Sequence, residues 1–231
     1  VEAGRPDTIT ADKLAVLRHR GAGRVSVNPQ SMDGRVLAAM GRAHRPEDIV
    51  RAYALVRDSG IPCVNMDLIA GLPADSPAGF RNTLEQVLAL GPENITVHTL
   101  ALKKGSRLTS GERGFALPSG EDVAGMLDWA WDTLEGAGQR PYYLYRQKYM
   151  SGSFENVGWT RPGFAGLYNI CMMEELHTIV SLGGGGVTKL VDRRAGRIRR
   201  LTNAKYPHEY LRDIDKTIAE KEALAAFYRE S

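Results

Sequence analysis

The sequence is poor in cysteine. Cys63 and Cys171 are the two cysteines among 231 residues, and they stand far apart. Two separate cysteines form no disulfide framework, and neither lies in the spacing of a zinc ribbon or an iron–sulfur motif. We therefore expect both thiols to behave as small buried side chains, and we expect no metal ligand in this chain.

Long apolar runs and a large charge of one sign are also absent. No run reaches the roughly 18 to 20 apolar residues that span a bilayer, and the start does not read as a signal peptide. Thirty Lys and Arg against 27 Asp and Glu leave a net charge of +3, which is too small to argue for a nucleic-acid partner. We expect a cytoplasmic monomer with no membrane and no nucleic-acid partner.

What the sequence does have is an alternation of β-branched runs and amphipathic helical stretches. Strands are expected at 24–28, 64–69, 94–100 and 142–145, and helices at 35–40, 46–58, from Ser76-Pro77 onward, and 121–135. This repeat predicts a parallel sheet with right-handed crossovers. The prediction is an α/β fold: an incomplete, TIM-like β/α barrel over residues 1–148.

The pattern changes past residue 148. A helix-like or buried stretch at 172–182 precedes a run of four glycines at 183–186, and 187–191 with 198–201 reads as a hairpin. Charged helices are expected between Pro207 and Tyr228. Residues 149–231 are therefore predicted to form a smaller C-terminal α+β extension.

Several polar residues fall at or just after the carboxyl ends of the expected strands, where parallel β/α folds bind ligands. They are Glu2, Gln30, Asp67 and the segment His98–Ala101, and Arg42 lies one short helix after Gln30. The alternative is structural: Asp67 would anchor a barrel layer, Gln30 would satisfy a turn, and Arg42 would be a solvated charge.

Seven segments resemble one enzyme family. They are VEAGRPDTI, RVSVNPQSM, GRAH, VNMDLIAGLPADSP, NITVHTLALKKGS, PYYLYRQKYM and the stretch from ENVGW to GGGGVTK. Together they resemble the radical S-adenosylmethionine (radical SAM) enzymes of the oxygen-independent coproporphyrinogen III oxidase family, in the branch called coproporphyrinogen dehydrogenase. The resemblance covers nearly the whole chain.

The resemblance implies residue roles at matching positions. S-adenosylmethionine would be held by Glu2, Gln30, Arg42, Asp67, Ala101 and Val187. The chemistry agrees, since a guanidinium suits the carboxylate of the cofactor and a carboxylate suits ribose hydroxyls.

The implied reaction is radical oxidative decarboxylation of the propionates of coproporphyrinogen III to vinyl groups, which gives protoporphyrinogen IX in haem biosynthesis. Aromatic rings and cations suit such a tetrapyrrole, and the candidates are Tyr143, Tyr145, Arg146 and Lys148. A strand with one core face explains the tyrosines equally well. The sequence names no catalytic residue.

The chain departs from the family at the iron–sulfur cluster. Family members hold a 4Fe-4S cluster through a CxxxCxxC-type run, and this chain has none. The expectation is that the cysteines lie in a preceding segment, that the intact enzyme takes electrons from a flavodoxin- or ferredoxin-type donor, and that the fragment alone is inactive. Two alternatives remain: a haem-binding chaperone related to these enzymes, or a radical SAM enzyme with another substrate.

Overall fold

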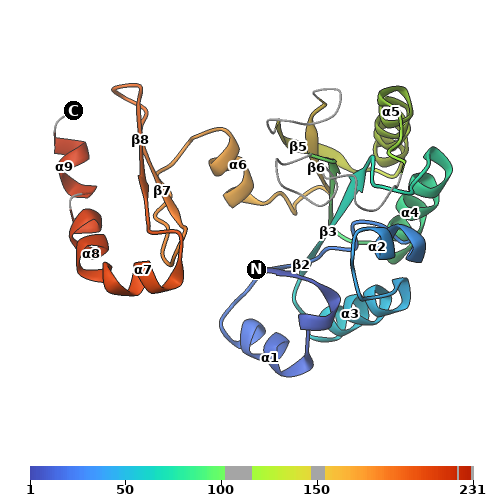
Figure 1. The fold of residues 1–231 in the computed structure, drawn as a ribbon, viewed down its shortest axis with the longest axis horizontal. Helices are drawn as coiled ribbons and strands as arrows, with labels where there is room; N and C mark the ends of the chain where they lie inside the picture. The colour runs from blue at the N-terminus through green and yellow to red at the C-terminus, as the bar shows by residue number, and fades with distance from the viewer. Residues whose placement is uncertain (102–115, 147–153, 223, 230–231) are drawn as a thin grey trace. The chain divides into compact units, whose positions relative to one another are not determined.

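The protein divides into two compact units, Val1–Ala165 and Gly166–Ser231. The computed structural model in Figure 1 describes residues 1–101, 116–146, 154–222 and 224–229. The predicted site residues from the expected barrel lie in the first unit, whereas Val187 lies in the second. Each unit is described by itself.

The first unit is built on a six-stranded sheet with the order β1-β2-β3-β4-β6-β5. Strands β1 to β4 run parallel to one another, and β6 is antiparallel to both β4 and β5. The parallel strands confirm the expected α/β fold with the character of a partial barrel. The bounds are β1 Glu2–Gly4, β2 Arg24–Val27, β3 Cys63–Ala70, β4 Asn94–Thr99, β5 Arg140–Tyr145 and β6 Asn156–Thr160.

Helices cover one face of this sheet (Figure 1). Local sequence signals set the ends of these helices. The Ser76 hydroxyl caps the N-terminus of α4, and Gly91 at its C-cap adopts the left-handed conformation that glycine accommodates without strain. Apolar side chains at helical spacing, such as Phe80 and Leu84, are buried against the strands. The bounds are η1 Pro6–Thr8, α1 Ala11–His19, α2 Gly34–Ala39, α3 Pro46–Asp58, α4 Pro77–Leu90 and α5 Gly120–Gly136.

Strand β6 extends the sheet beyond the expected domain boundary. The boundary after residue 148 falls within 147–153, outside the described residues. Strand β6 follows it in sequence but pairs with β4 and β5, because its buried Trp159 packs into the core of the first unit. The sheet of the expected barrel therefore takes in residues that the sequence reading placed in the extension.

The second unit combines the predicted hairpin with short helices. Strands β7 and β8 pair antiparallel, as the hairpin prediction required. The prediction of a helix-like or buried stretch at 172–182 is wrong. The helix ends at Met173, no residue of the stretch is buried, and Ile179 bridges to Lys189 in β7. The bounds are α6 Leu167–Met173, β7 Val187–Asp192, β8 Arg197–Thr202, α7 Pro207–Arg212, α8 Ile214–Glu222 and α9 Leu224–Arg229.

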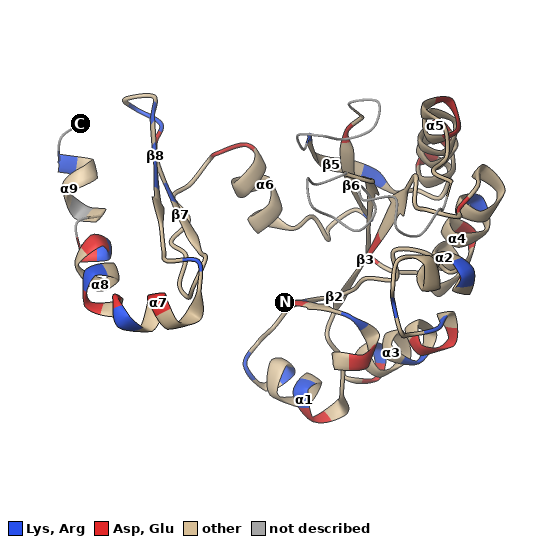
Figure 2. Ribbon diagram, in the orientation of Figure 1, with Lys and Arg blue, Asp and Glu red and all other residues tan. Residues whose placement is uncertain are grey.

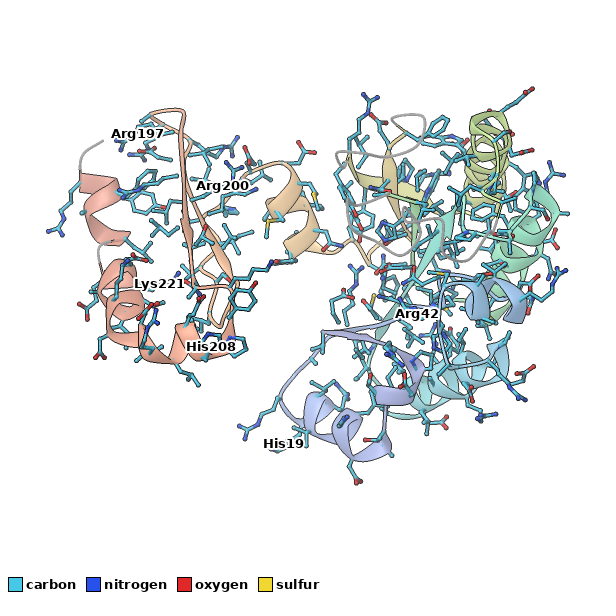
Figure 3. All side chains as sticks on the ribbon, viewed as in Figure 1. His19, Arg42, Arg197, Arg200, His208 and Lys221 are labelled. Carbon is cyan, nitrogen blue, oxygen red and sulfur yellow. The ribbon has the colours of Figure 1, made fainter. Side chains whose placement is uncertain are left out.

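Basic residues gather on the hairpin of the second unit (Figure 2). Arg197 and Arg200, both on β8 and labelled in Figure 3, are nevertheless paired with acidic side chains. Arg197 lies 3.6 Å from Asp192, and Arg200 lies 3.0 Å from Glu175. These two arginines therefore have their charges paired within the second unit. None of the helices in the described ranges has the length and apolar character needed to cross a membrane.

Candidate functional site

The sheet of the first unit has one apolar face and one polar face. On β3, Met66 and Leu68 are fully buried among the apolar core residues. The alternating residues Asn65 and Asp67 point to the opposite side, because successive side chains in a strand alternate between faces. We call this side the polar face. It also carries Ser26 of β2, Thr96 and His98 of β4, and Tyr143 and Tyr145 of β5, with Glu2 of β1 at its edge.

A chain of hydrogen bonds crosses the polar face from its β1 edge to β3. The Ser26 hydroxyl donates to Glu2 Oε1 over 2.8 Å. The Asn65 amide donates to Ser26 Oγ over 3.4 Å and to Asp67 Oδ1 over 2.7 Å. The structure therefore links Glu2 and Asp67, two of the residues expected to hold the cofactor, through two intervening side chains.

The chain continues toward the tyrosines of β5. Thr96 Oγ1 donates to Asn65 Oδ1 over 3.3 Å and lies 3.3 Å from the Tyr143 hydroxyl. His98 has its Nε2 atom 3.7 Å from Asp67 Oδ2 and its Nδ1 atom 3.1 Å from the Tyr145 hydroxyl. The expected cofactor residue Asp67 and the expected substrate residues Tyr143 and Tyr145 thus lie on one connected surface.

Asp67 is held in its ionised form. Burial by itself would raise the pKa of this carboxyl, but His98 first, and then Asn65 and Thr96, stabilise the charge and hold the pKa below its ordinary value. Tyr143 shows the opposite balance, since burial raises the pKa of its hydroxyl despite the Thr96 contact. The site therefore presents a carboxylate next to a neutral phenol at neutral pH.

Gln30 lies beside Asp67 in an unusual conformation. Its φ angle is 65°, in the left-handed region that few side-chain-bearing residues adopt. Its backbone N–H donates to Asp67 O over 2.9 Å, and its carbonyl accepts from Ile69 N over 3.1 Å. Within the described part of the chain, its buried Oε1 atom has no hydrogen-bond partner. A buried acceptor without a partner suits a ligand that donates hydrogen bonds, such as a nucleoside.

The other expected cofactor residues lie outside this hydrogen-bonded chain. Arg42, labelled in Figure 3, lies in the loop between α2 and α3 and is half-buried. Ala101 lies two residues after the end of β4 and is half-buried as well. Val187 begins β7 and is exposed. These three positions stay predictions.

The two cations expected to contact substrate are placed differently. Arg146 follows β5 on the exposed surface, where its guanidinium lies 3.2 Å from Glu155 Oε1. Its charge is therefore already paired with a carboxylate. Lys148 lies outside the described residues.

The cysteines do not suit an iron–sulfur cluster. Burial raises the pKa of the Cys63 thiol to about 11, and its Sγ atom donates to Asn94 Oδ1 over 2.9 Å. Cluster ligands are thiolates, which this environment disfavours. Cys171 lies on α6 in the second unit. Across the ranges that the structure describes, no three His, Cys, Asp or Glu side chains are grouped as metal ligands would be.

Sequence reasoning missed Asn65 and Thr96, which join the other residues of the polar face. Each lies inside a strand and not at its end. The rule that ligand residues follow the ends of strands therefore identifies neither of them. The spacing of polar residues along each strand could have indicated both. Asn65 lies two residues before Asp67, and Thr96 two residues before His98, so each pair shares one face of its strand.

Comparison with known proteins identifies the class first. Residues 3–87 match the model of the Radical SAM superfamily, so this part of the chain is a radical SAM domain. Those residues include β2 and β3 in full, together with Gln30, Arg42 and Asp67; Glu2, at the start of β1, lies one residue before the matched range.

Within that class, the expected relationship to oxygen-independent coproporphyrinogen III oxidases is confirmed. The chain is 44% identical to the oxygen-independent coproporphyrinogen-III oxidase-like protein HemZ of Bacillus subtilis, over 91% of this chain and 42% of that protein. It is 25% identical to the heme chaperone HemW of Escherichia coli, over 92% of this chain and 54% of that protein. The chain thus spans about half the length of these curated relatives.

A solved structure shows the same fold. The coproporphyrinogen III oxidase HemN from Escherichia coli superimposes with a TM-score of 0.67 at 21% identity, covering 92% of this chain and 48% of that chain. At this identity the match supports the fold alone. It agrees with the partial β/α barrel of the first unit.

Proposed function

We propose that this chain forms part of a radical SAM enzyme that oxidatively decarboxylates coproporphyrinogen III. The observation that carries the proposal is the ionised Asp67 on the polar face of a radical SAM domain, next in the sheet to the backbone of Gln30, whose buried Oε1 atom has no partner among the described residues. The 44% identity to a coproporphyrinogen-III oxidase-like protein supports the choice of substrate.

The residues of the polar face fit S-adenosylmethionine. Asp67 would accept hydrogen bonds from ribose hydroxyls, and Gln30 Oε1 would accept one more from the ribose or the amino group. Arg42 would pair with the carboxylate of the cofactor, a geometry for which guanidinium is suited. When bound to a 4Fe-4S cluster, S-adenosylmethionine supplies the radical chemistry, while the protein binds and orients the reactants. The cysteines of this chain do not fit the cluster, so we assign no step to them.

The tyrosines would receive the tetrapyrrole. Tyr143 and Tyr145 stack with their ring centroids 6.3 Å apart and an interplanar angle of 11°. Their faces offer an apolar surface beside the carboxylate of Asp67. The substrate would therefore lie next to the cofactor, on the β5 side of the polar face.

Cofactor binding tests the first level of this proposal. Isothermal titration of the 231-residue chain with S-adenosylmethionine should show saturable binding, which Asp67→Asn should weaken by about tenfold, the worth of one hydrogen bond to a charged group. Asp58→Asn is the matched control, because Asp58 is an exposed carboxylate at the end of α3. Equal affinity in wild type and Asp67→Asn would show that the polar face does not hold the cofactor.

Turnover tests the second level. The native gene product, purified anaerobically with iron and sulfide, should convert coproporphyrinogen III to protoporphyrinogen IX when given S-adenosylmethionine and a reductant. Chromatography of the oxidised porphyrins measures both substrate and product.

A haem chaperone is the second candidate, supported by the match to HemW over 92% of this chain. Titration with haem separates the two. A stoichiometric shift of the Soret band in a protein that leaves coproporphyrinogen III unchanged would favour the chaperone and reject the decarboxylase.

A further inference from the structure

His98 connects the two sides of the polar face. It lies on β4 opposite Ile69 of β3, two strand positions beyond the Asp67–Thr96 pair and so on the same face. Its imidazole is half-buried, with 23% of the side chain exposed, and its two nitrogen atoms face different partners. Nε2 lies 3.7 Å from Asp67 Oδ2, and Nδ1 lies 3.1 Å from the Tyr145 hydroxyl.

The charge of Asp67 determines which His98 nitrogen carries the proton. A carboxylate stabilises an N–H group that faces it, so the proton of the neutral imidazole belongs on Nε2. Nδ1 is then an acceptor, and the Tyr145 hydroxyl must be the donor. The Tyr145 hydroxyl therefore donates to His98 Nδ1, while the N–H at Nε2 faces Asp67 Oδ2 across 3.7 Å in electrostatic contact.

We propose that His98 is a positioning residue that fixes Asp67 and Tyr145 relative to each other. This inference rests on the proposed function, in which Asp67 contacts the cofactor and Tyr145 contacts the tetrapyrrole. With both its nitrogen atoms engaged, the imidazole holds the carboxylate in the orientation that receives the ribose, and it orients the phenol by the same set of contacts. Removal of the imidazole nitrogens loosens both groups at once.

The edge contact between the rings supports the arrangement. The His98 and Tyr145 ring centroids are 6.2 Å apart at an interplanar angle of 71°, and the Tyr145 hydroxyl lies 3.1 Å from Nδ1. Tyr143 provides the matched comparison on the same strand. Its hydroxyl faces Thr96 at 3.3 Å and not His98.

Nuclear magnetic resonance of ¹⁵N-histidine-labelled protein tests the pairing without cofactor. The chain has five histidines, so the imidazole signals can be assigned by substitution. In the neutral form of His98 we expect the proton on Nε2, and we expect Tyr145→Phe to shift the Nδ1 signal while Tyr143→Phe leaves that signal in place. If the His98 Nδ1 signal does not shift in Tyr145→Phe, or if it shows that the proton is on Nδ1, the proposed pairing is wrong.

Titration with S-adenosylmethionine tests the positioning role. His98→Phe keeps a ring but removes both nitrogen atoms, and we expect it to weaken binding by about tenfold, the net worth of one hydrogen bond. His98→Gln should restore part of this loss, because its amide can both accept from Tyr145 and donate to Asp67. His19→Phe is the control, since His19 is exposed on α1 (Figure 3).

The outcomes separate the two proposals. Wild-type affinity in His98→Phe, or equal losses in His98→Phe and His98→Gln, would reject the positioning role while the proposed function stands. No binding by the wild-type chain would reject cofactor binding and the coupling with it, and the resonance data would then still decide whether Tyr145, His98 and Asp67 are paired.

Discussion

Gly158 leaves the space that the Tyr143 ring occupies, and this predicts a specific cost for Gly158→Ala. The two residues are partners on the antiparallel strands β5 and β6. A Cβ atom on residue 158 would lie 1.9 Å from Tyr143 Cε1, 2.4 Å from Cδ1 and 2.5 Å from Cζ. Carbon atoms pack at about 3.5 to 4.0 Å, so the ring must move away by more than an ångström.

The magnitude follows from what the displaced ring loses. Overpacking of a fitted site costs roughly 1 to 3 kcal/mol, and loss of the contact between the Tyr143 and Thr96 hydroxyls adds about 1 kcal/mol. We therefore expect Gly158→Ala to lower the free energy of unfolding by about 2 to 4 kcal/mol. Gly125→Ala on α5 is the matched control, because its Cβ atom would meet no atom within 4 Å and alanine favours a helix by roughly 0.5 to 1 kcal/mol.

Urea unfolding followed by tryptophan fluorescence measures this cost. Trp129, Trp131 and Trp159 are the three tryptophans and all lie in the first unit, so the signal reports that unit. In a Tyr143→Ala background the ring is gone, and Gly158→Ala should then cost less than about 1 kcal/mol. Equal costs of Gly158→Ala in both backgrounds would refute the packing explanation.

Three further predictions concern the buried polar groups of the first unit. Iodoacetamide at pH 8 should leave Cys63 unmodified while it labels Cys171. A pKa of about 11 leaves about one Cys63 side chain in a thousand as the reactive thiolate. Peptide mass spectrometry measures the labelling, and rapid labelling of Cys63 would contradict the prediction. Arg57→Ala should lower the free energy of unfolding in urea by about 2 to 3 kcal/mol, because both carboxylate oxygens of the buried Glu93 accept from Arg57 Nη1 over 2.9 Å. A loss below about 0.5 kcal/mol would show that this pair is not important for stability. Asp67 has its pKa lowered in the folded state, so its ionised form contributes stability that is present above the unfolded pKa of about 3.9 and is lost as the pH falls through the folded pKa. The stability of wild type relative to Asp67→Asn should therefore fall below about pH 4, and a difference that grew in acid would contradict this sign.

The regular elements of the first unit could be predicted because local signals and burial agree there. The helix at Pro46–Asp58 has proline in its first turn, apolar residues at helical spacing and Gly60 after it, and the structure gives the same bounds. Strand β6 could not be recognised in this way. Its sequence NVGWT has no regular alternation, and its place in the sheet comes from pairing with strands distant in sequence.

The site likewise has features that the sequence could predict and features that it could not. Asp67 could be named from the sequence because it lies near the end of a buried apolar strand, where ligand residues collect. The hydrogen bonds that give it a lowered pKa come from Asn65 and from a different strand, β4, in a register that the sequence does not specify. Single residues could therefore be predicted at the site, whereas the connections between them needed the structure.

Those connections bear on how a ligand binds. Ser26, Asn65 and Thr96 satisfy one another and their neighbours before any ligand arrives, so the carboxylate of Asp67 is oriented in advance. A face arranged in this way loses little conformational freedom on binding, which favours affinity. Gln30 differs, because its Oε1 atom is buried without a partner among the described residues and a ligand donor would remove that cost. Asp67 is thus oriented before any ligand arrives, whereas Gln30 offers a buried acceptor whose desolvation cost a hydrogen-bond donor of a ligand would offset.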